Sequence, residues 1–400
     1  MAVTSAKDVH GSAKSAVPSL LYRPEVRQAF YQVLLVVVLG LFFWMVIDNA
    51  ITNLRKQNVA AGFGFLDRTA GFDISQHFID YSSQSTYRQA ILVGLINTLV
   101  VSVIGIVLAT ILGFVMGVAR LSKNWLIAKI ASGYVEVSRN VPLLLQLFVW
   151  YFAVLASLPQ AREAHALPGG GFLSVRGLSM PKPIGEPGFG WVVVVALLGL
   201  IGSIAFAWYA RVRQLQTGQR LPVLWVTLGL LAMLPALTFL IAGRPLSFDY
   251  PVLGRFNLAG GLTLQPEMVA MILGLVFYTG GYIAEVVRAG ILGVNKGQKE
   301  AAAAIGLPPG LVMRLVVIPQ AMRIIIPPLT SQYLNLTKNS SLGIAIAYPD
   351  LTHVLANTTL GLTNQAIETI ALLMGIYLTL SLLTSFFMNW FNRRMALVER

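Results

Sequence analysis

The chain contains 400 residues, of which 56% are hydrophobic and 11% are charged, and its mean hydropathy is +0.72. Soluble domains carry roughly 25% charged residues, so this composition excludes an ordinary soluble protein and indicates a surface that faces lipid. The absence of cysteine excludes disulfides, thiolate metal sites and cysteine nucleophiles.

Long apolar runs predict about eight membrane-spanning helices. A bilayer core of ~30 Å needs about 20 helical residues to cross it. The runs lack the alternating pattern of barrel strands, and a helix satisfies its own backbone polar groups in lipid. We therefore expect an all-α polytopic membrane protein whose spans lie at about 31–52, 91–119, 140–158, 190–210, 222–243, 268–290, 311–336 and 366–391.

The segments between the predicted spans differ in composition. Residues 1–30 are polar and precede an apolar run that is too long for a signal-peptide core, so we expect a tail rather than a cleaved signal. Residues 53–90 are expected to form an external linker, whose aromatic residues beside glycines suit the lipid headgroup region. Residues 159–189 are rich in proline and glycine and predict an irregular external loop. The spans within 190–243 share a short basic loop and predict a helical hairpin, and residues 392–400 form a second tail.

The distribution of charge predicts the orientation. An even number of spans places both termini on one side of the membrane. Of the 29 Lys and Arg residues, 18 then fall on that side, 10 fall on the other, and Arg323 lies within a span. Because positively charged loops stay in the cytoplasm, both termini are expected to be cytoplasmic. This topology accounts for the net charge of +13 without a nucleic-acid partner.

The loop between the sixth and seventh spans, residues 291–310, contains a short polar helix. Ala301–Ala304 are strong helix formers, and Gly306 followed by Pro308 and Pro309 ends the helix. The predicted orientation places this helix of about two turns in the cytoplasm. From these residues alone, it is either a docking surface or an ordinary amphipathic connector at the membrane surface.

The same loop resembles the signature loop of permease subunits of bacterial binding-protein-dependent ABC importers. The pattern is carried by Glu300-Ala301-Ala302, by Gly306, and by Val316-Val317-Ile318-Pro319, where Val316 and Ile318 depart conservatively from the commonest Ile and Leu. In that family the helix sits in a groove of the ATPase subunit and transmits nucleotide-driven motion. The resemblance implies an ATPase-coupling role for Gly297, Glu300, Ala301, Ala302, Gly306, Val316, Ile318 and Pro319.

Further segments resemble the polar amino acid branch of that family and cover about 91–158 and 265–391. They are Asn97-Thr98-Leu99, Arg139–Phe148, Tyr278–Gly290 and Lys338–Leu342. The resemblance implies an importer transmembrane domain at 91–391, with a five-helix type-I core, an extra span at 31–52 and the inserted hairpin at 190–243. This longer layout is similar to the permeases of general L-amino acid uptake systems in Gram-negative bacteria. It implies an inner-membrane location and three protein partners: an ABC ATPase, a second permease, identical or related, and a periplasmic amino-acid-binding protein.

Three charged residues lie near predicted span ends. Glu285 and Arg288 are three residues apart and share a helical face. They predict either an interfacial ion pair that fixes helix register or, because ionisable groups near membrane depth are often functional, a gate. Arg139 precedes Pro142 at the start of the third span, where it is either a positive anchor at the cytoplasmic interface or a contact with the ATPase or a gate.

A polar segment interrupts the apolar run near the outer half of the seventh span. Pro327 and Pro328 lie upstream and must weaken the helix, which frees carbonyl groups. A cation beside hydrogen-bonding side chains suits a zwitterion that carries a carboxylate; the alternative is a polar helix end at the outer interface. The predicted substrate-path residues are Gln146, Asn335, Lys338, Asn339, Ser340 and Ser341.

The sequence has no glycine-rich phosphate loop of the G-x-x-x-x-G-K-[ST] type and no catalytic constellation. We therefore expect no enzyme and no cofactor on this chain, with ATP and Mg²⁺ bound by a partner ATPase. No metal site is expected either, because the four histidines are scattered. The alternative function is a self-sufficient, ion-coupled secondary transporter of small polar solutes, in which Glu285 or Lys338 would be the coupling charge. The lack of a visible internal repeat counts against it.

Overall fold

A computed structural model of the chain describes residues 24–56, 62–254 and 257–395. Most of the predicted tails 1–30 and 392–400 lies outside these residues. The chain divides into two compact units, of which one comprises Met1–Phe63 with Thr363–Glu368 and the other comprises Gly64–Leu362 with Thr369–Arg400. The sites described below all lie in the second unit.

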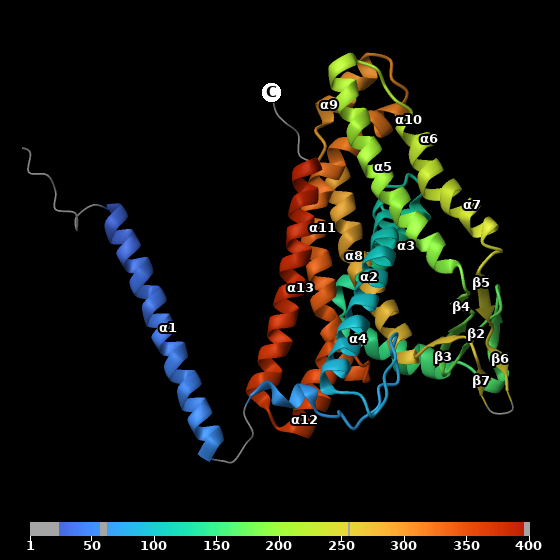
Figure 1. Cartoon of the computed structure of the whole chain (residues 1–400). Helices are drawn as coiled ribbons and strands as arrows, with labels where there is room; N and C mark the ends of the chain where they lie inside the picture. Colours follow the sequence, from blue (N-terminus) through green and yellow to red (C-terminus); the bar gives the residue numbers. More distant parts are fainter. Residues whose placement is uncertain (1–23, 57–61, 255–256, 396–400) are drawn as a thin grey trace, which may run out of the picture. The chain divides into compact units, whose positions relative to one another are not determined.

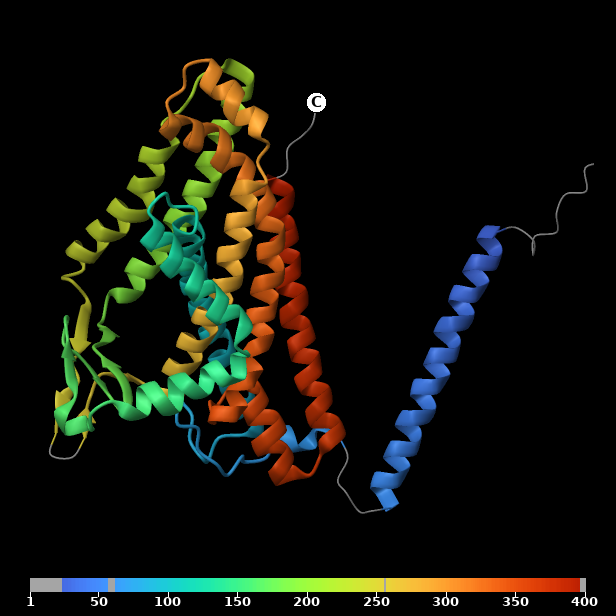
Figure 2. The same ribbon diagram turned by 180° about the vertical axis from the view of Figure 1, so that it is seen from behind.

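Long apolar helices occupy all eight predicted spans within the described residues (Figures 1 and 2). Seven of them are single helices or helical runs long enough to cross a membrane, and the eighth is a bent pair. The all-α polytopic fold class is therefore confirmed. The long helices are α1 (Pro24–Lys56), α2 (Tyr87–Ala119), α5 (Phe189–Thr217), α8 (Pro266–Leu292), α11 (Ile318–Asn339) and α13 (Ala366–Met395).

Shorter segments complete the helical runs and the connections. The hairpin after α5 returns through α6 (Val223–Leu228), η6 (Gly229–Met233) and α7 (Leu234–Ile241). Apart from the helices of the third span, the other short helices are η2 (Phe63–Asp67), η5 (Ala161–Glu163), α9 (Lys296–Ala304), α10 (Pro309–Val312), η7 (Met313–Val317), η8 (Ser340–Ile346), η9 (His353–Thr359) and α12 (Leu360–Thr363).

The third span begins earlier than the sequence predicted. It consists of α3 (Trp125–Asn140) followed by α4 (Leu143–Phe148), η3 (Val149–Val154) and η4 (Leu155–Ser157), with a bend of 109° between the two halves. Val141 at the bend is extended, with φ −93° and ψ 125°, because the ring of a following proline disfavours the helical conformation. The apolar-run criterion placed this span at 140–158 and missed α3, because α3 carries the charged residues Lys129, Glu136 and Arg139.

The predicted irregular loop at 159–189 is wrong in part, because it contains strands. These are β1 (His165–Leu167), β2 (Gly171–Ser174), β3 (Gly177–Met180) and β4 (Lys182–Gly185). Their partners β5 (Leu246–Asp249) and β8 (Leu262–Leu264) follow the hairpin, and β6 (Val252–Leu253) pairs with β7 (Leu258–Ala259). The largest sheet has the antiparallel order β1-β2-β3-β8. The pairing spans about 80 residues, so the local composition of each loop did not reveal it.

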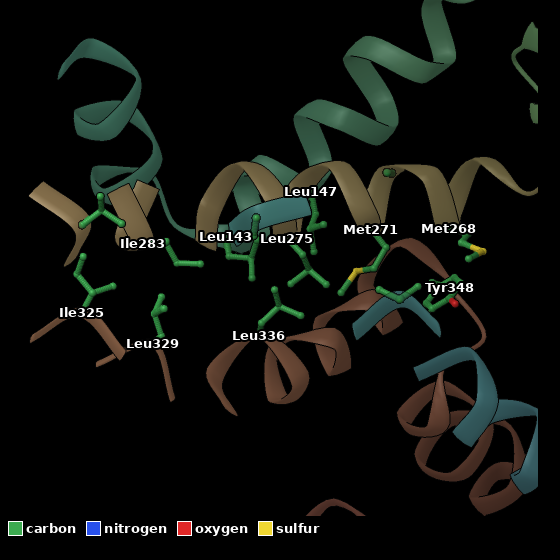
Figure 3. Packing of buried hydrophobic residues seen from close by; sticks show 14 of the residues in the cluster. Leu143, Leu147, Met268, Met271, Leu275, Ile283, Ile325, Leu329, Leu336 and Tyr348 are labelled. Atoms are coloured by element: carbon green, nitrogen blue, oxygen red, sulfur yellow. The ribbon is translucent and has the colours of Figure 1, made fainter. Parts of the chain in front are cut away.

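Helix α8 lies at the centre of the second unit and packs against α2, α3, α4 and α11. Small residues bring the helices close together: a Cβ added at Gly113 of α2 would lie 2.5 Å from Ile283, and one at Gly290 would lie 2.3 Å from Ile325. The buried core lies where α8 packs against its neighbouring helices, as Figure 3 shows for Leu147, Met271, Leu275, Ile283, Ile325, Leu329 and Leu336.

A second, smaller core lies in the segment before α2. Phe65 is 1% exposed and packs with Tyr81, Tyr87 and Val93. The sequence suggested the headgroup region for the phenylalanines beside Gly62, Gly64 and Gly71, but the structure buries one of them, Phe65, against the first turns of α2. The segment 64–86 is therefore packed onto the helices that it precedes.

Figure 1 places α9 and α10 at one end of the second unit and the sheets at the opposite end. We call these the α9 end and the sheet end. Helices α2 and α8 both begin at the sheet end and end toward the α9 end.

Candidate functional site

The loop at the α9 end is built on a capped short helix. The side chain of Asn295 accepts a hydrogen bond from the N–H of Gly297 at 2.9 Å and caps the N-terminus of α9. At the other end, the N–H of Gly306 donates to Ala303 O at 2.9 Å and that of Leu307 donates to Ala302 O at 3.2 Å. This paired pattern with Gly306 at φ +83° is a Schellman motif, which glycine adopts without steric cost.

Six of the eight predicted coupling residues are exposed. Within α9 only Ala302 is buried, while Gly297, Glu300 and Ala301 are exposed. A Cβ added at Gly306 would meet no atom within 4 Å, so the glycine is required by its backbone conformation rather than by crowding. Val316 is half-buried at the start of the next helical run, where Ile318 and Pro319 are exposed.

A cluster of charged residues lies where α2, α3 and α8 meet. Glu285 accepts a hydrogen bond from Arg288 Nη2 at 2.6 Å and from Arg120, the C-cap residue of α2. Arg139 Nη1 lies 3.9 Å from the same carboxylate. The structure thus brings the three predicted residues together and adds Arg120. Sequence reasoning missed Arg120 because it is 165 residues from Glu285 and its helix is not adjacent in the chain.

A polar cavity of about 320 Å³ lies between α8 and α11, and we call it the α8–α11 cavity. Its lining residues are Tyr278, Thr279, Tyr282, Gln332, Asn335 and Asn339. The hydroxyl groups of Tyr278 and Tyr282 are 3.4 Å apart. Sequence reasoning named the two asparagines and missed the other four. Tyr278 and Tyr282 are four residues apart, as are Asn335 and Asn339, so helical spacing was the available signal.

The other predicted substrate-path residues lie outside this lining. Lys338 is exposed on α11, and Ser340 is buried with its hydroxyl donating to Thr337 O at 2.8 Å. Ser341 is half-buried, and its hydroxyl donates to Lys338 O at 2.7 Å. Gln146 is also buried, and its Nε2 donates to Ser138 O at 2.9 Å and to Val141 O at 2.8 Å. Gln146 therefore satisfies carbonyl groups that the 109° bend exposes.

A buried network ties α2 to the segment after η8. Asn97 Nδ2 donates to Gln76 O and to Pro349 O, both at 2.8 Å. The hydroxyl of Tyr348 donates back to Asn97 O at 3.0 Å, and Thr98 accepts from the N–H of Leu351 at 3.0 Å. The sequence drew attention to Asn97 and Thr98 only through a resemblance. Their contacts identify them as the link between distant backbone segments at the sheet end.

The chain matches the model of a protein family described as "Binding-protein-dependent transport system inner membrane component" over residues 213–397. It is 53% identical to the general L-amino acid transport system permease protein AapQ of Rhizobium johnstonii, over 98% of each chain. It is 47% identical to the putative amino-acid ABC transporter permease protein YhdX of Escherichia coli, over 94% of this chain and 96% of the relative.

A third relative is the glutamate/glutamine/aspartate/asparagine transport system permease protein BztB of Rhodobacter capsulatus, which is 39% identical over 95% of this chain and 96% of its own length. Among solved structures, one described as an amino acid ABC transporter with histidines is 21% identical, with a TM-score of 0.47 over 77% of this chain and 95% of its own. The predicted resemblance to longer permeases of Gram-negative bacteria is confirmed by the relatives of nearly equal length.

Proposed function

Because the chain belongs to the inner-membrane components of binding-protein-dependent transport systems, we propose that it forms the membrane path of an ATP-driven importer of L-amino acids. The names of the relatives support this substrate class. The ion-coupled secondary transporter receives no support from them.

The ATPase partner would bind the α9 end. Its contact surface would be the exposed face of α9 and the turn at Gly306, which offer small side chains and polar groups to another protein. Hydrolysis must occur on that partner, since this chain lacks a phosphate-binding loop. The positive-inside bias supports a cytoplasmic location for this end and for both termini.

A second permease subunit would cover an exposed polar face of α11. Ser331, Asn335 and Lys338 are exposed on this membrane-spanning run. Polar side chains in contact with hydrocarbon are costly, and a lysine at membrane depth more so. A subunit interface that encloses an aqueous path removes this cost. The partner is a second copy or a relative of this chain, and the path runs between the two α11 faces.

The substrate path would include the α8–α11 cavity, which presents hydroxyl and amide groups to an amino acid. Lys338 lies beside it on the exposed face of α11 and would attract the substrate carboxylate. At the sheet end, the three small sheets would form part of the surface that receives a periplasmic amino-acid-binding protein. Closure of the ATPase subunits would draw the two α9 helices together and change the access of this path, as in hinge and shear motions of packed helices.

The single observation that carries this proposal is the exposed α9 with its Schellman cap, because no contact within the described residues explains its exposed face. Co-purification tests it. A tagged chain expressed with its neighbouring ATPase, permease and binding-protein genes should retain the ATPase subunit through detergent extraction. A tagged chain that purifies alone and transports amino acids in liposomes without any ATPase would contradict the proposal.

A further inference from the structure

A second cavity shares Tyr282 with the lining of the α8–α11 cavity. It has a volume of about 240 Å³ and is lined by Arg120, Val135, Glu136, Arg139, Asn140 and Tyr282. We call it the α3 cavity, because four of these residues belong to α3. Tyr282 is the one residue that lines both cavities, so the two are neighbours along α8.

Among the arginines around the α3 cavity, Arg139 is the most weakly paired. Glu285 is already hydrogen-bonded to Arg288 and Arg120. Arg139 approaches it only to 3.9 Å, and its side chain remains 43% exposed. Its other contact is the face of Tyr282, whose ring centroid lies 5.4 Å from the guanidinium carbon. The Arg139 side chain forms no hydrogen bond with any residue that the structure describes, so its planar guanidinium donors are available to an anion.

The same wall carries an acidic group. Glu136 lies three residues before Arg139 and therefore on the same side of α3, and its side chain also lines the cavity. Glu136 forms no salt bridge within residues 24–56, 62–254 and 257–395. Asn140 adds an amide one residue after Arg139. A cation, a carboxylate and an amide on one wall match the carboxylate, the ammonium and the side chain of an amino acid.

We propose that the α3 cavity binds an α-amino acid as a zwitterion, with Arg139 holding the carboxylate and Glu136 the ammonium group. This assignment rests on the proposed transport function and adds a second substrate-binding site to the path, next to the α8–α11 cavity at Tyr282. Rotation of the Tyr282 ring away from Arg139 joins the two cavities and frees the guanidinium for the arriving carboxylate. The volume of 240 Å³ is several times the roughly 30 Å³ that one water occupies in the liquid.

The absence of cysteine permits a direct test of occupancy. Asn140→Cys introduces one thiol into the cavity wall, and the parent chain in the same complex gives the blank for thiols of the other subunits. The complete transporter is placed in inside-out vesicles and treated with a membrane-impermeant thiol reagent. L-Glutamine at ten times its dissociation constant is expected to slow modification about tenfold. The α-amide of glutamine, which lacks the carboxylate, is expected to give no protection.

Two further variants isolate the role of the guanidinium. Adding Arg139→Gln to the cysteine variant is expected to raise the glutamine concentration needed for protection about ten- to a hundredfold, as for one charge-assisted hydrogen-bonded pair. Arg139→Lys keeps the charge and, if Arg139→Gln fails to assemble, reports the loss of the planar donors alone. Gln216→Cys, at the exposed end of α5, is the matched control and should be modified at the same rate with or without glutamine.

The outcomes separate this site from the transport function. ATP-dependent uptake by the parent transporter, which keeps Asn140, tests the transport function alone. Uptake by the parent transporter, together with no protection of the Asn140→Cys thiol at any glutamine concentration, would overturn the α3 cavity site and leave the importer intact. Equal protection by glutamine and by its α-amide would show a cavity that closes nonspecifically, and it would also overturn the assignment of Arg139. Loss of uptake in the parent chain itself would instead refute the proposed function.

Discussion

Gly306→Ala is expected to weaken the binding of the ATPase subunit without unfolding the chain. Gly306 adopts φ +83°, and no atom lies within 4 Å of an added Cβ. The substitution therefore introduces no clash, and its cost is the left-handed backbone, which is about 1–2 kcal/mol for a residue with a Cβ. If the ATPase requires the native turn, its affinity falls by the same free energy, which is about 5- to 30-fold.

Gly310→Ala is the matched control for this prediction. Gly310 lies four residues further along the same loop, also has no atom within 4 Å of an added Cβ, and does not have a positive φ. The assay titrates purified ATPase subunit onto permease-containing membranes and measures bound ATPase and ATP-dependent uptake. We expect normal membrane content for both variants and weaker binding for Gly306→Ala alone. Equal affinities for Gly306→Ala and the unaltered chain, or equal losses for both variants, would refute the reasoning.

Three further predictions concern other parts of the molecule. Lys338→Ala should raise the KM for uptake about ten- to a hundredfold through loss of a charge-assisted contact with the substrate, whereas the control Lys123→Ala should leave KM unchanged. Normal uptake and normal stimulated ATPase activity in Lys338→Ala would show that Lys338 does not contact the substrate. Asn97→Ala leaves two buried carbonyl groups without donors and should lower the free energy of unfolding by about 2–4 kcal/mol, measured by thermal denaturation in detergent; a change below ~1 kcal/mol would contradict the network. Burial raises the pKa of Asp350 from 3.8 to about 6. Because the folded chain therefore holds this proton more tightly than the unfolded chain, the contribution of Asp350 to the free energy of unfolding is largest at low pH. This contribution is lost as the pH rises through about 6, by about 3 kcal/mol. Asp350→Asn should flatten this decline between about pH 4 and pH 7, and an unchanged pH profile would contradict the burial argument.

The membrane-spanning helices were predictable because hydrocarbon thickness fixes their length. Each apolar run in the sequence is long enough to cross the bilayer, and α2, α8 and α13 begin and end within a few residues of the predicted bounds, whereas α5 continues to Thr217, beyond the predicted end at 210. The third span was the exception. Its first half, α3, carries Lys129, Glu136 and Arg139, so a hydropathy criterion recognised only the apolar half after the bend.

The pairings between distant segments were not predictable. Strand β3 pairs with β8 beyond an entire helical hairpin, and nothing in the composition of either loop specifies that partner. The same limit applies to Arg120, whose contact with Glu285 depends on how α2 packs on α8. Gln146 shows a different limit: it was assigned to the substrate path as a polar residue in a span, but its hydrogen bonds to Ser138 O and Val141 O satisfy the bend.

Reconstituted transport tests the central claim most directly. Proteoliposomes that contain this chain, its second permease and the ATPase are supplied with ATP inside, and with L-glutamine and the binding protein outside. We expect glutamine to accumulate only when the ATPase subunit and ATP are both present. We also expect this accumulation to continue when ion gradients are collapsed. Accumulation that continues without the ATPase, or that collapses with an ion gradient, would contradict the account.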